Sequence, residues 1–103
     1  MPLPQDRQTD ALFDSILRLE SVEECYRFFE DLCTVKEVRD FAQRLEVARL
    51  LHGGSSYQQA ADRTGASSAT IGRVKKCLQY GAGGYRMMMG RMKEAGESDD
   101  ENG

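Results

Sequence analysis

Apolar residues recur along most of the chain with the three- and four-residue spacing of amphipathic α-helices. The segments Ser21-Val22-Glu23-Glu24 and Thr34-Val35-Lys36-Glu37 each have the pattern of a capping box, which predicts the start of a helix. No stretch alternates apolar and polar residues between turn residues, so we expect no strand. The first two apolar faces are formed by Leu12, Phe13, Ile16 and Leu17 and by Val22, Cys25, Tyr26 and Phe29. A third face, expected to point inward, is formed by Val35, Val38, Ala42, Leu45 and Ala48.

Glycine-rich breaks divide the second half of the chain. Gly53-Gly54-Ser55-Ser56 ends one helix near His52, and residues 81–84 separate a further helical segment from a short, methionine-rich final helix. We therefore predict an all-α fold of about six helices, formed by a single domain over residues 1–93. The acidic segment 94–103 has no aliphatic anchor, and we expect it to be disordered.

Residues 57–78, with the sequence YQQAADRTGASSATIGRVKKCL, have the spacing of a helix-turn-helix. Ala61 is a small residue where a second helix would press against the first, and Gly65 suits a turn that requires a positive φ. Ile71 and Val74 then follow at helical spacing and are predicted to point inward. A helical hairpin without any role in DNA binding can have the same spacing.

The outer face of the predicted second helix favours contact with double-stranded DNA. Ser67 or Ser68 can cap this helix, and its small side chains allow a close approach to base edges. Arg73 could bond a guanine edge or a phosphate, whereas lysine and glutamine side chains suit the DNA backbone. A solvated helix face would also be rich in such residues. The residues predicted to bind DNA are Gln58, Gln59, Ser67, Ser68, Ala69, Thr70, Gly72, Arg73, Lys75 and Lys76.

The net charge of −3 conceals an uneven distribution along the chain. Residues 1–43 carry ten acidic and five basic groups, residues 44–93 carry two acidic and nine basic groups, and residues 94–103 carry five acidic groups. Phosphate binding responds to local positive charge, so the basic middle segment modestly favours nucleic acid. An ordinary solvated surface of uneven sign would give the same counts.

Several other classes of protein are disfavoured by the composition. No apolar run approaches the ~20 residues of a membrane span, and the first ten residues do not form a signal peptide, so we expect a cytoplasmic protein. Cys25, Cys33 and Cys77 form no metal-ligand pattern with His52, and we expect reduced, buried thiols and no metal site. One histidine and no glycine-rich phosphate loop leave no evident chemistry for an enzyme.

The segment Gly65-Ala66-Ser67-Ser68-Ala69-Thr70-Ile71-Gly72-Arg73 resembles the recognition helix of the Trp repressor superfamily, and particularly its Trp-repressor-related branch of YerC/YecD type. Leu50-Leu51-His52-Gly53 and residues 56–61 add to this resemblance, which covers about residues 10–93. It implies a Trp-repressor-like intertwined homodimer whose two recognition helices lie about 34 Å apart along the DNA. It also implies a sequence-specific transcriptional regulator, with repression as the expected effect.

The same resemblance raises the question of tryptophan as a corepressor. The family holds the amino acid with two arginines and a glycine-walled slot, and Arg73 and Arg44 match the arginines. Val74 stands where the glycine admits the indole, and Cys77 stands where a serine bonds the ligand's amino group. A β-branched side chain would clash with a flat indole, and a thiol is a weaker polar partner than a hydroxyl. We therefore expect that tryptophan is not a corepressor, and the sequence names no other small-molecule effector.

Two hypotheses for the helix-turn-helix follow from these observations. The leading one is a homodimer that regulates transcription by binding double-stranded DNA. The alternative is a helical interaction module that uses the same surface to bind a protein partner. Binding that weakens steeply with rising salt would indicate DNA, because an apolar protein interface depends little on salt.

Overall fold

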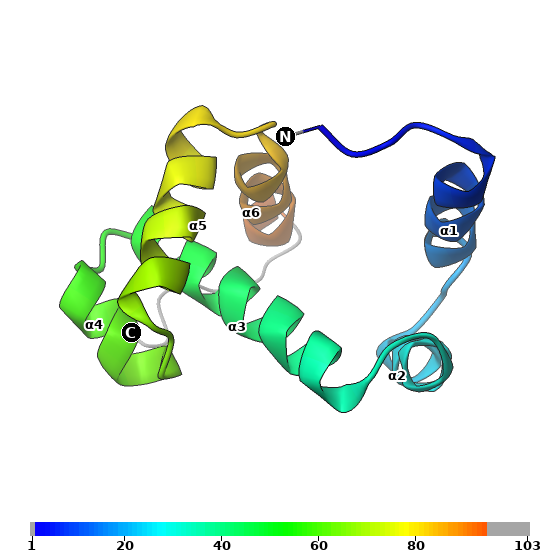
Figure 1. Ribbon diagram of the computed structural model, residues 1–103, viewed down its shortest axis with the longest axis horizontal. Coiled ribbons are helices and arrows are strands. Elements are labelled where there is room, and N and C mark those ends of the chain that lie inside the picture. The colour runs from blue at the N-terminus through cyan, green and yellow to red at the C-terminus, as the bar shows by residue number, and fades with distance from the viewer. Residues whose placement is uncertain (1, 95–103) are drawn as a thin grey trace. The chain divides into compact units, whose positions relative to one another are not determined.

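The computed structural model describes residues 2–94 (Figure 1). Over this range the chain forms six helices and no strand, which confirms the predicted all-α fold. The helices are α1 (Arg7–Leu17), α2 (Val22–Leu32), α3 (Val35–His52), α4 (Tyr57–Thr64), α5 (Ser68–Tyr80) and α6 (Gly84–Glu94). The chain divides into two compact units within α3, the first reaching to Val38 and the second beginning at Arg39. The tail predicted to be disordered lies, from Ala95 onward, outside the described residues.

Polar side chains cap the starts of α2 and α3. Thr34 Oγ1 accepts a hydrogen bond from the Glu37 N–H at 3.1 Å, and the Glu37 carboxylate accepts one from the Thr34 N–H at 2.9 Å, so the predicted capping box is complete. Ser21 likewise accepts from the Glu24 N–H. The Glu24 carboxylate, however, bonds the N–H of Glu20 instead of the N–H of Ser21. The second half of that capping box is therefore shifted by one residue.

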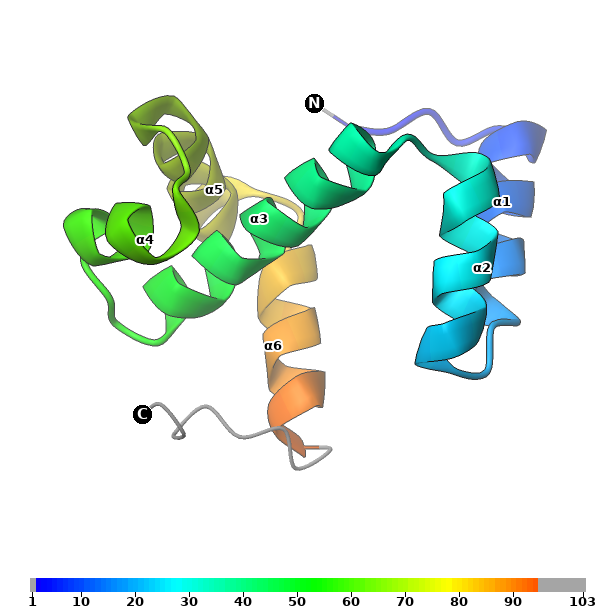
Figure 2. The same ribbon diagram turned by 90° about the horizontal axis from the view of Figure 1, so that it is seen from below.

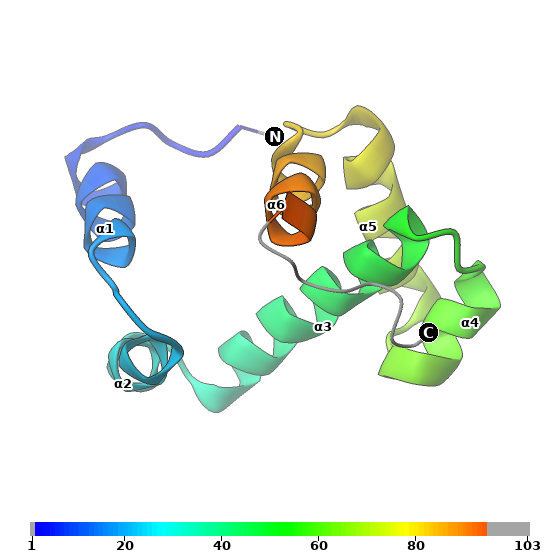
Figure 3. The ribbon, with the colours of Figure 1, turned by 180° about the vertical axis from the view of Figure 1, so that it is seen from behind.

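The core of the second unit lies where α3, α4, α5 and α6 meet (Figures 1 and 2). α5 contacts both α4 and α6, and Figure 3 shows the same helices from behind. Ile71 and Val74 of α5 are each 1% exposed, which confirms their predicted inward position. Burial of such a side chain contributes about 1.5–3 kcal/mol to folding. The buried residues of the core are Val47, Ala48, Leu50, Ala60, Ala66, Ile71, Val74 and Met89.

The apolar faces of α1, α2 and the first turns of α3 are not buried within one chain. Leu17, Val22 and Val35 are 81%, 73% and 69% exposed. Ala48 is fully buried as predicted, but Leu45 on the same helix remains exposed. The predicted inward face of α3 is therefore confirmed at Ala48 and wrong at Val35 and Leu45 in a single chain. Periodicity identifies an apolar face but does not say which surface covers it, and exposed apolar surface of this kind is typical of interaction sites.

The thiols also differ from expectation. Cys25 and Cys33 are half-buried and Cys77 is exposed, so the prediction of buried cysteines is wrong. Within residues 2–94, no three histidine, cysteine or acidic side chains come together in a way that could hold a metal ion. None of the helices described is long and apolar enough to cross a membrane.

Gly65→Ala tests the turn between α4 and α5. Gly65 has a φ of +73°, and its N–H donates to the Ala61 carbonyl at 2.8 Å. No atom lies within 4 Å of an added Cβ, so the cost of the substitution is conformational. We expect a loss of about 1–2 kcal/mol in the free energy of unfolding, measured with urea at fixed protein concentration.

Gly90→Ala is the matched control, because Gly90 lies inside α6 and an added Cβ there also meets open space. This change should raise the free energy of unfolding by about 0.5–1 kcal/mol, since glycine is the poorer helix former. Effects of the same sign at both glycines would contradict the conformational explanation.

Candidate nucleic-acid interface

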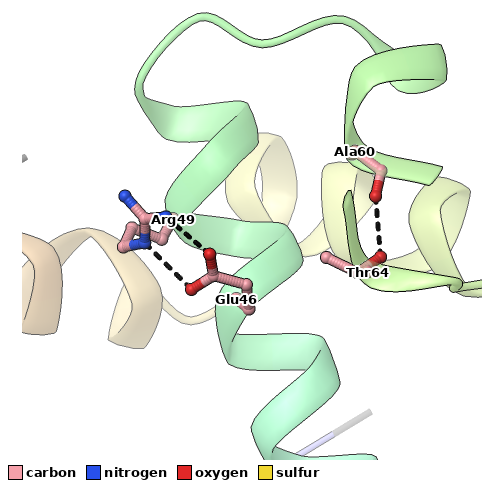
Figure 4. A network of polar contacts seen from close by, with 4 residues as sticks. All are labelled: Glu46, Arg49, Ala60 and Thr64. Carbon is pink, nitrogen blue, oxygen red and sulfur yellow. Dashed lines mark hydrogen bonds and ion pairs between the residues drawn. The ribbon is translucent and has the colours of Figure 1, made fainter. Parts of the chain in front are cut away.

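A short hydrogen-bond network fixes the turn between α4 and α5. The Thr64 hydroxyl donates to the Ala60 carbonyl at 2.7 Å and accepts from the Ala66 N–H at 3.1 Å (Figure 4 shows the first bond). The Gln43 side-chain amide of α3 donates to the Thr64 carbonyl at 3.1 Å. Together with the left-handed Gly65, these bonds set the direction in which α5 leaves the turn and tie the helix-turn-helix to α3.

Gln59, one of the glutamines predicted to bind DNA, takes part in the cap at the start of α4. Gln59 and Ser56 form a complete capping box, in which the Gln59 side-chain oxygen accepts from the Ser56 N–H at 2.8 Å. The neighbouring Gln58 amide donates to the Asp62 carboxylate at 2.9 Å. Both side chains thus have an intrahelical role, and any contact of Gln59 with DNA falls to its NH₂ group.

Ser67 caps the start of α5. The sequence had left Ser67 and Ser68 as alternative caps, and the structure selects Ser67. The Ser67 hydroxyl accepts from the Thr70 N–H at 3.1 Å and lies 3.1 Å from the Thr70 hydroxyl. Ser68 and Ala69 are then the first two helical residues, and both are exposed. The first turn of α5 therefore presents small side chains to the surroundings.

The outer face of α5 carries small side chains together with positively charged ones. Arg73 and Lys76 are exposed on it, and a Cβ added to Gly72 would meet no atom within 4 Å. Lys75 points elsewhere: its ammonium lies 5.5 Å from the centre of the Tyr57 ring at the start of α4. Such a cation–π contact contributes about 0.5–1 kcal/mol at exposed sites. The structure therefore separates Lys75 from the other predicted DNA contacts of α5.

The two acidic residues of the basic segment both have partners nearby. The Arg49 guanidinium donates to the Glu46 carboxylate, with an Nε–Oε1 distance of 2.9 Å (Figure 4). This hydrogen bond is the main reason that the pKa of Glu46 lies below its usual value, and the positive charges of Arg49 and Arg63 act in the same direction. Asp62 accepts the hydrogen bond from Gln58. Glu46 and Asp62 therefore reduce the net positive charge around the helix-turn-helix. Glu46 does so beside a basic group and Asp62 beside an amide.

The residues of the predicted amino-acid slot lie in different surroundings. Val74 is buried in the core, Cys77 is exposed, and the Arg44 guanidinium lies over the Phe41 ring at 5.4 Å. Tyr85 of α6 belongs to the same neighbourhood: burial is the main cause that raises its pKa, with the charge of Arg44 opposing and the Cys77 thiol adding to the shift. Tyr85 belongs to the methionine-rich segment that was predicted to be the final helix, and nothing in its spacing relates it to α3 and α5.

Among the residues around a hollow on one side of α5, the sequence identified only Lys75 as a binding residue, and it did not indicate the hollow itself. They come from α3, the turn after it, α5 and α6, and no spacing pattern connects these four segments. The positive charges of Lys75 and Arg86 were the one feature of the sequence that could have indicated a binding site there. The residues that line it are Leu51, His52, Ser55, Lys75, Leu78, Gln79 and Arg86.

Comparison with known proteins identifies the class to which this fold and site belong. The family model of the Trp repressor protein matches residues 7–93. The chain therefore belongs to the Trp repressor family, as the recognition-helix segment predicted. Within the family it is of the Trp-repressor-related YerC type: it is 56% identical over 88 residues to the uncharacterised protein YerC of Bacillus subtilis strain 168, with 85% of each chain covered.

Solved structures agree with this assignment. A candidate Trp repressor from Staphylococcus aureus has a TM-score of 0.84 and 48% identity, over 86% of this chain and 89% of that chain. A TrpR-like protein from Eubacterium eligens ATCC 27750 has a TM-score of 0.80 and 44% identity, over 82% of this chain and 87% of that chain.

Proposed function

We propose that the chain is a homodimeric transcriptional regulator that binds specific double-stranded DNA sites through α4 and α5. The observation that carries the proposal is the outer face of α5, where small exposed residues and the exposed Arg73 and Lys76 follow a tightly fixed turn. A helix with small side chains can approach base edges in the major groove, and the cations can neutralise phosphates beside it. Membership in the Trp repressor family supports this role.

The dimer in this proposal accounts for the exposed apolar faces of the first unit. Val22 and Tyr26 on α2 are 73% and 67% exposed, although their spacing is that of a face that packs inward. A second copy of the chain would cover such a face, and a 103-residue chain buries a limited share of its own surface. Two-fold symmetry would also place two copies of α5 on neighbouring turns of the DNA groove.

Repression is the regulatory effect that we expect.

Arg73→Ala should weaken binding to the selected DNA site about ten-fold or more, because the guanidinium contacts a guanine edge or a phosphate in this proposal. The site is first obtained by selection from random duplexes, and affinity is then measured by fluorescence anisotropy across a salt series. A two-fold symmetric selected sequence is expected. Arg91→Ala on α6 removes the same charge from another exposed position and is the matched control.

The salt series also distinguishes DNA binding from the alternative role as a protein-interaction module. Binding through several lysine and arginine contacts should weaken steeply as salt rises. An unchanged affinity for Arg73→Ala, with the dimer still folded, would count against the role of Arg73. Failure to enrich any DNA site at low salt would count against the function as a whole.

Tyr26→Lys tests the dimer. A lysine placed in an apolar interface would lose hydration without gaining a partner, so we expect the dimer dissociation constant to rise about ten-fold or more. Sedimentation equilibrium measures this constant directly. Gln8→Lys adds the same charge at an exposed polar position of α1 and should leave the constant unchanged. A wild-type chain that remains monomeric at micromolar concentrations would contradict the homodimer.

Free tryptophan should not bind the protein at micromolar concentrations. Val74 is 1% exposed and packs in the core, so an indole beside it would have to displace buried side chains. Isothermal titration calorimetry of the full chain, with and without the selected DNA, checks this expectation. Saturable heat with a micromolar dissociation constant, or DNA binding that strengthens with added tryptophan, would show that the slot opens.

A further inference from the structure

A hollow of about 220 Å³ lies beside α5, between the end of α3 and the first turn of α6. Lys75 and Gln79 of α5 form one wall of the hollow. His52 at the end of α3, Ser55 in the turn after it and Arg86 of α6 form the rest of its polar lining. One leucine from α3 and one from α5 complete the surface. All of these residues belong to the second unit of the chain.

The hollow is separate from the slot that the family resemblance points to. Cys77, which belongs to that slot, stands two residues from Lys75 and two residues from Gln79 along α5. A step of two residues in an α-helix places side chains roughly 160° apart around the axis. α5 therefore has Cys77 on one flank and the hollow on the opposite flank, with the outer face that carries Arg73 and Lys76 between them.

The electrostatic character of the hollow is positive. No carboxylate is among the residues that line it. Within residues 2–94, neither Lys75 nor Arg86 makes an ion pair, and the printed contact of Lys75 is with the Tyr57 ring. Two like charges on the walls of one small hollow repel each other, and a bound anion would replace this repulsion by attraction to both. The lining therefore favours an anionic ligand.

The chemistry of the donors favours phosphate among the anions. The guanidinium of Arg86 can present paired N–H groups to phosphate oxygens, and the ammonium of Lys75 supplies a point charge. The Gln79 amide and the Ser55 hydroxyl add neutral donors, which suits the several oxygens of a phosphate group. The volume of 220 Å³ corresponds to about seven water molecules and is below the ~300 Å³ of the smaller drug-sized pockets. A phosphate group with a small organic part matches this size.

We propose that this hollow is a phosphate-binding site. The phosphate can come from either of two sources, a small phosphomonoester free in solution or a phosphate of the DNA backbone. With a free phosphomonoester the hollow is an effector site that does not depend on DNA binding. With backbone phosphate the proposal rests on the proposed function and adds Arg86, which is not among the residues predicted to bind DNA, to a contact that includes Lys75.

The first experiment uses the full chain without DNA. Inorganic phosphate and phenyl phosphate are titrated at low chloride concentration, and two-dimensional NMR follows the backbone amides of Ser55, Gln79 and Arg86, with acetate as the control anion. Saturable shifts with phosphate and not with acetate are expected if the source is free phosphate. Arg86→Gln should then weaken this binding about ten-fold or more, since it removes a charged pair of donors. Arg91→Gln, which changes an exposed arginine of the same helix outside the hollow, should not.

The second experiment measures DNA affinity of the same variants across a salt series. If the backbone supplies the phosphate, Arg86→Gln should reduce the salt slope by about one and Arg91→Gln should not. If Arg86→Gln loses free phosphate binding and keeps the wild-type salt slope, the source is the small molecule. Should the wild-type chain bind no DNA at all, the proposed function fails and the phosphate titration alone decides the site.

The proposal is overturned when the wild-type chain shows no saturable phosphate binding and Arg86→Gln leaves the salt slope equal to that of Arg91→Gln. Far-UV circular dichroism and thermal unfolding establish that each variant is folded. Lys75→Gln provides a second variant in the lining of the hollow. If Arg86→Gln weakens phosphate binding in the titration without DNA, Lys75→Gln must weaken it as well. A change that appears in Arg91→Gln to the same extent would also overturn the proposal, because it would reflect general charge.

Discussion

The burial of Ile71 and Val74 determines the direction of every other face of α5. Both side chains lie in one cluster with Ala48 and Ala60, and small partners at these positions allow the helices to approach closely. Because helix geometry relates all residues of α5 rigidly, placing these two inward leaves Arg73 and Lys76 outward. The candidate interface is thus a consequence of core packing, with Gly65 supplying the backbone conformation that the turn needs.

The helix caps, the turn and the inward positions of the helix-turn-helix could be predicted from the sequence, because each of them depends on residues that are close together in the chain. The helix-turn-helix follows from Ala61, Gly65, Ile71 and Val74, and the structure confirms the inward positions of the last two. The capping box at Thr34 forms as its residue types require. Caps, turns and periodicity are properties of a few consecutive residues, so a single chain carries the information for them.

The remaining features depend on what lies beside an element, which spacing cannot specify. Val22 and Leu45 have the periodicity of buried residues but are exposed in one chain, because their pattern identifies an apolar face without its partner. Tyr85 approaches Arg44 only because α6 returns to α3 and α5. The hollow is assembled from four segments in the same way. Tertiary neighbours of this kind must be observed in a structure.

The burial of Val74 bears on where a small molecule could bind beside α5. Its side chain is buried in the core, so a flat ring beside it would have to displace buried side chains. The flank opposite Cys77 carries Lys75 and borders the cationic hollow. If the protein responds to a small molecule, the hollow on this flank offers it a binding site lined by polar and cationic side chains. A ligand there would contact α3, α5 and α6 together and would therefore act on the orientation of the recognition helix without entering the core.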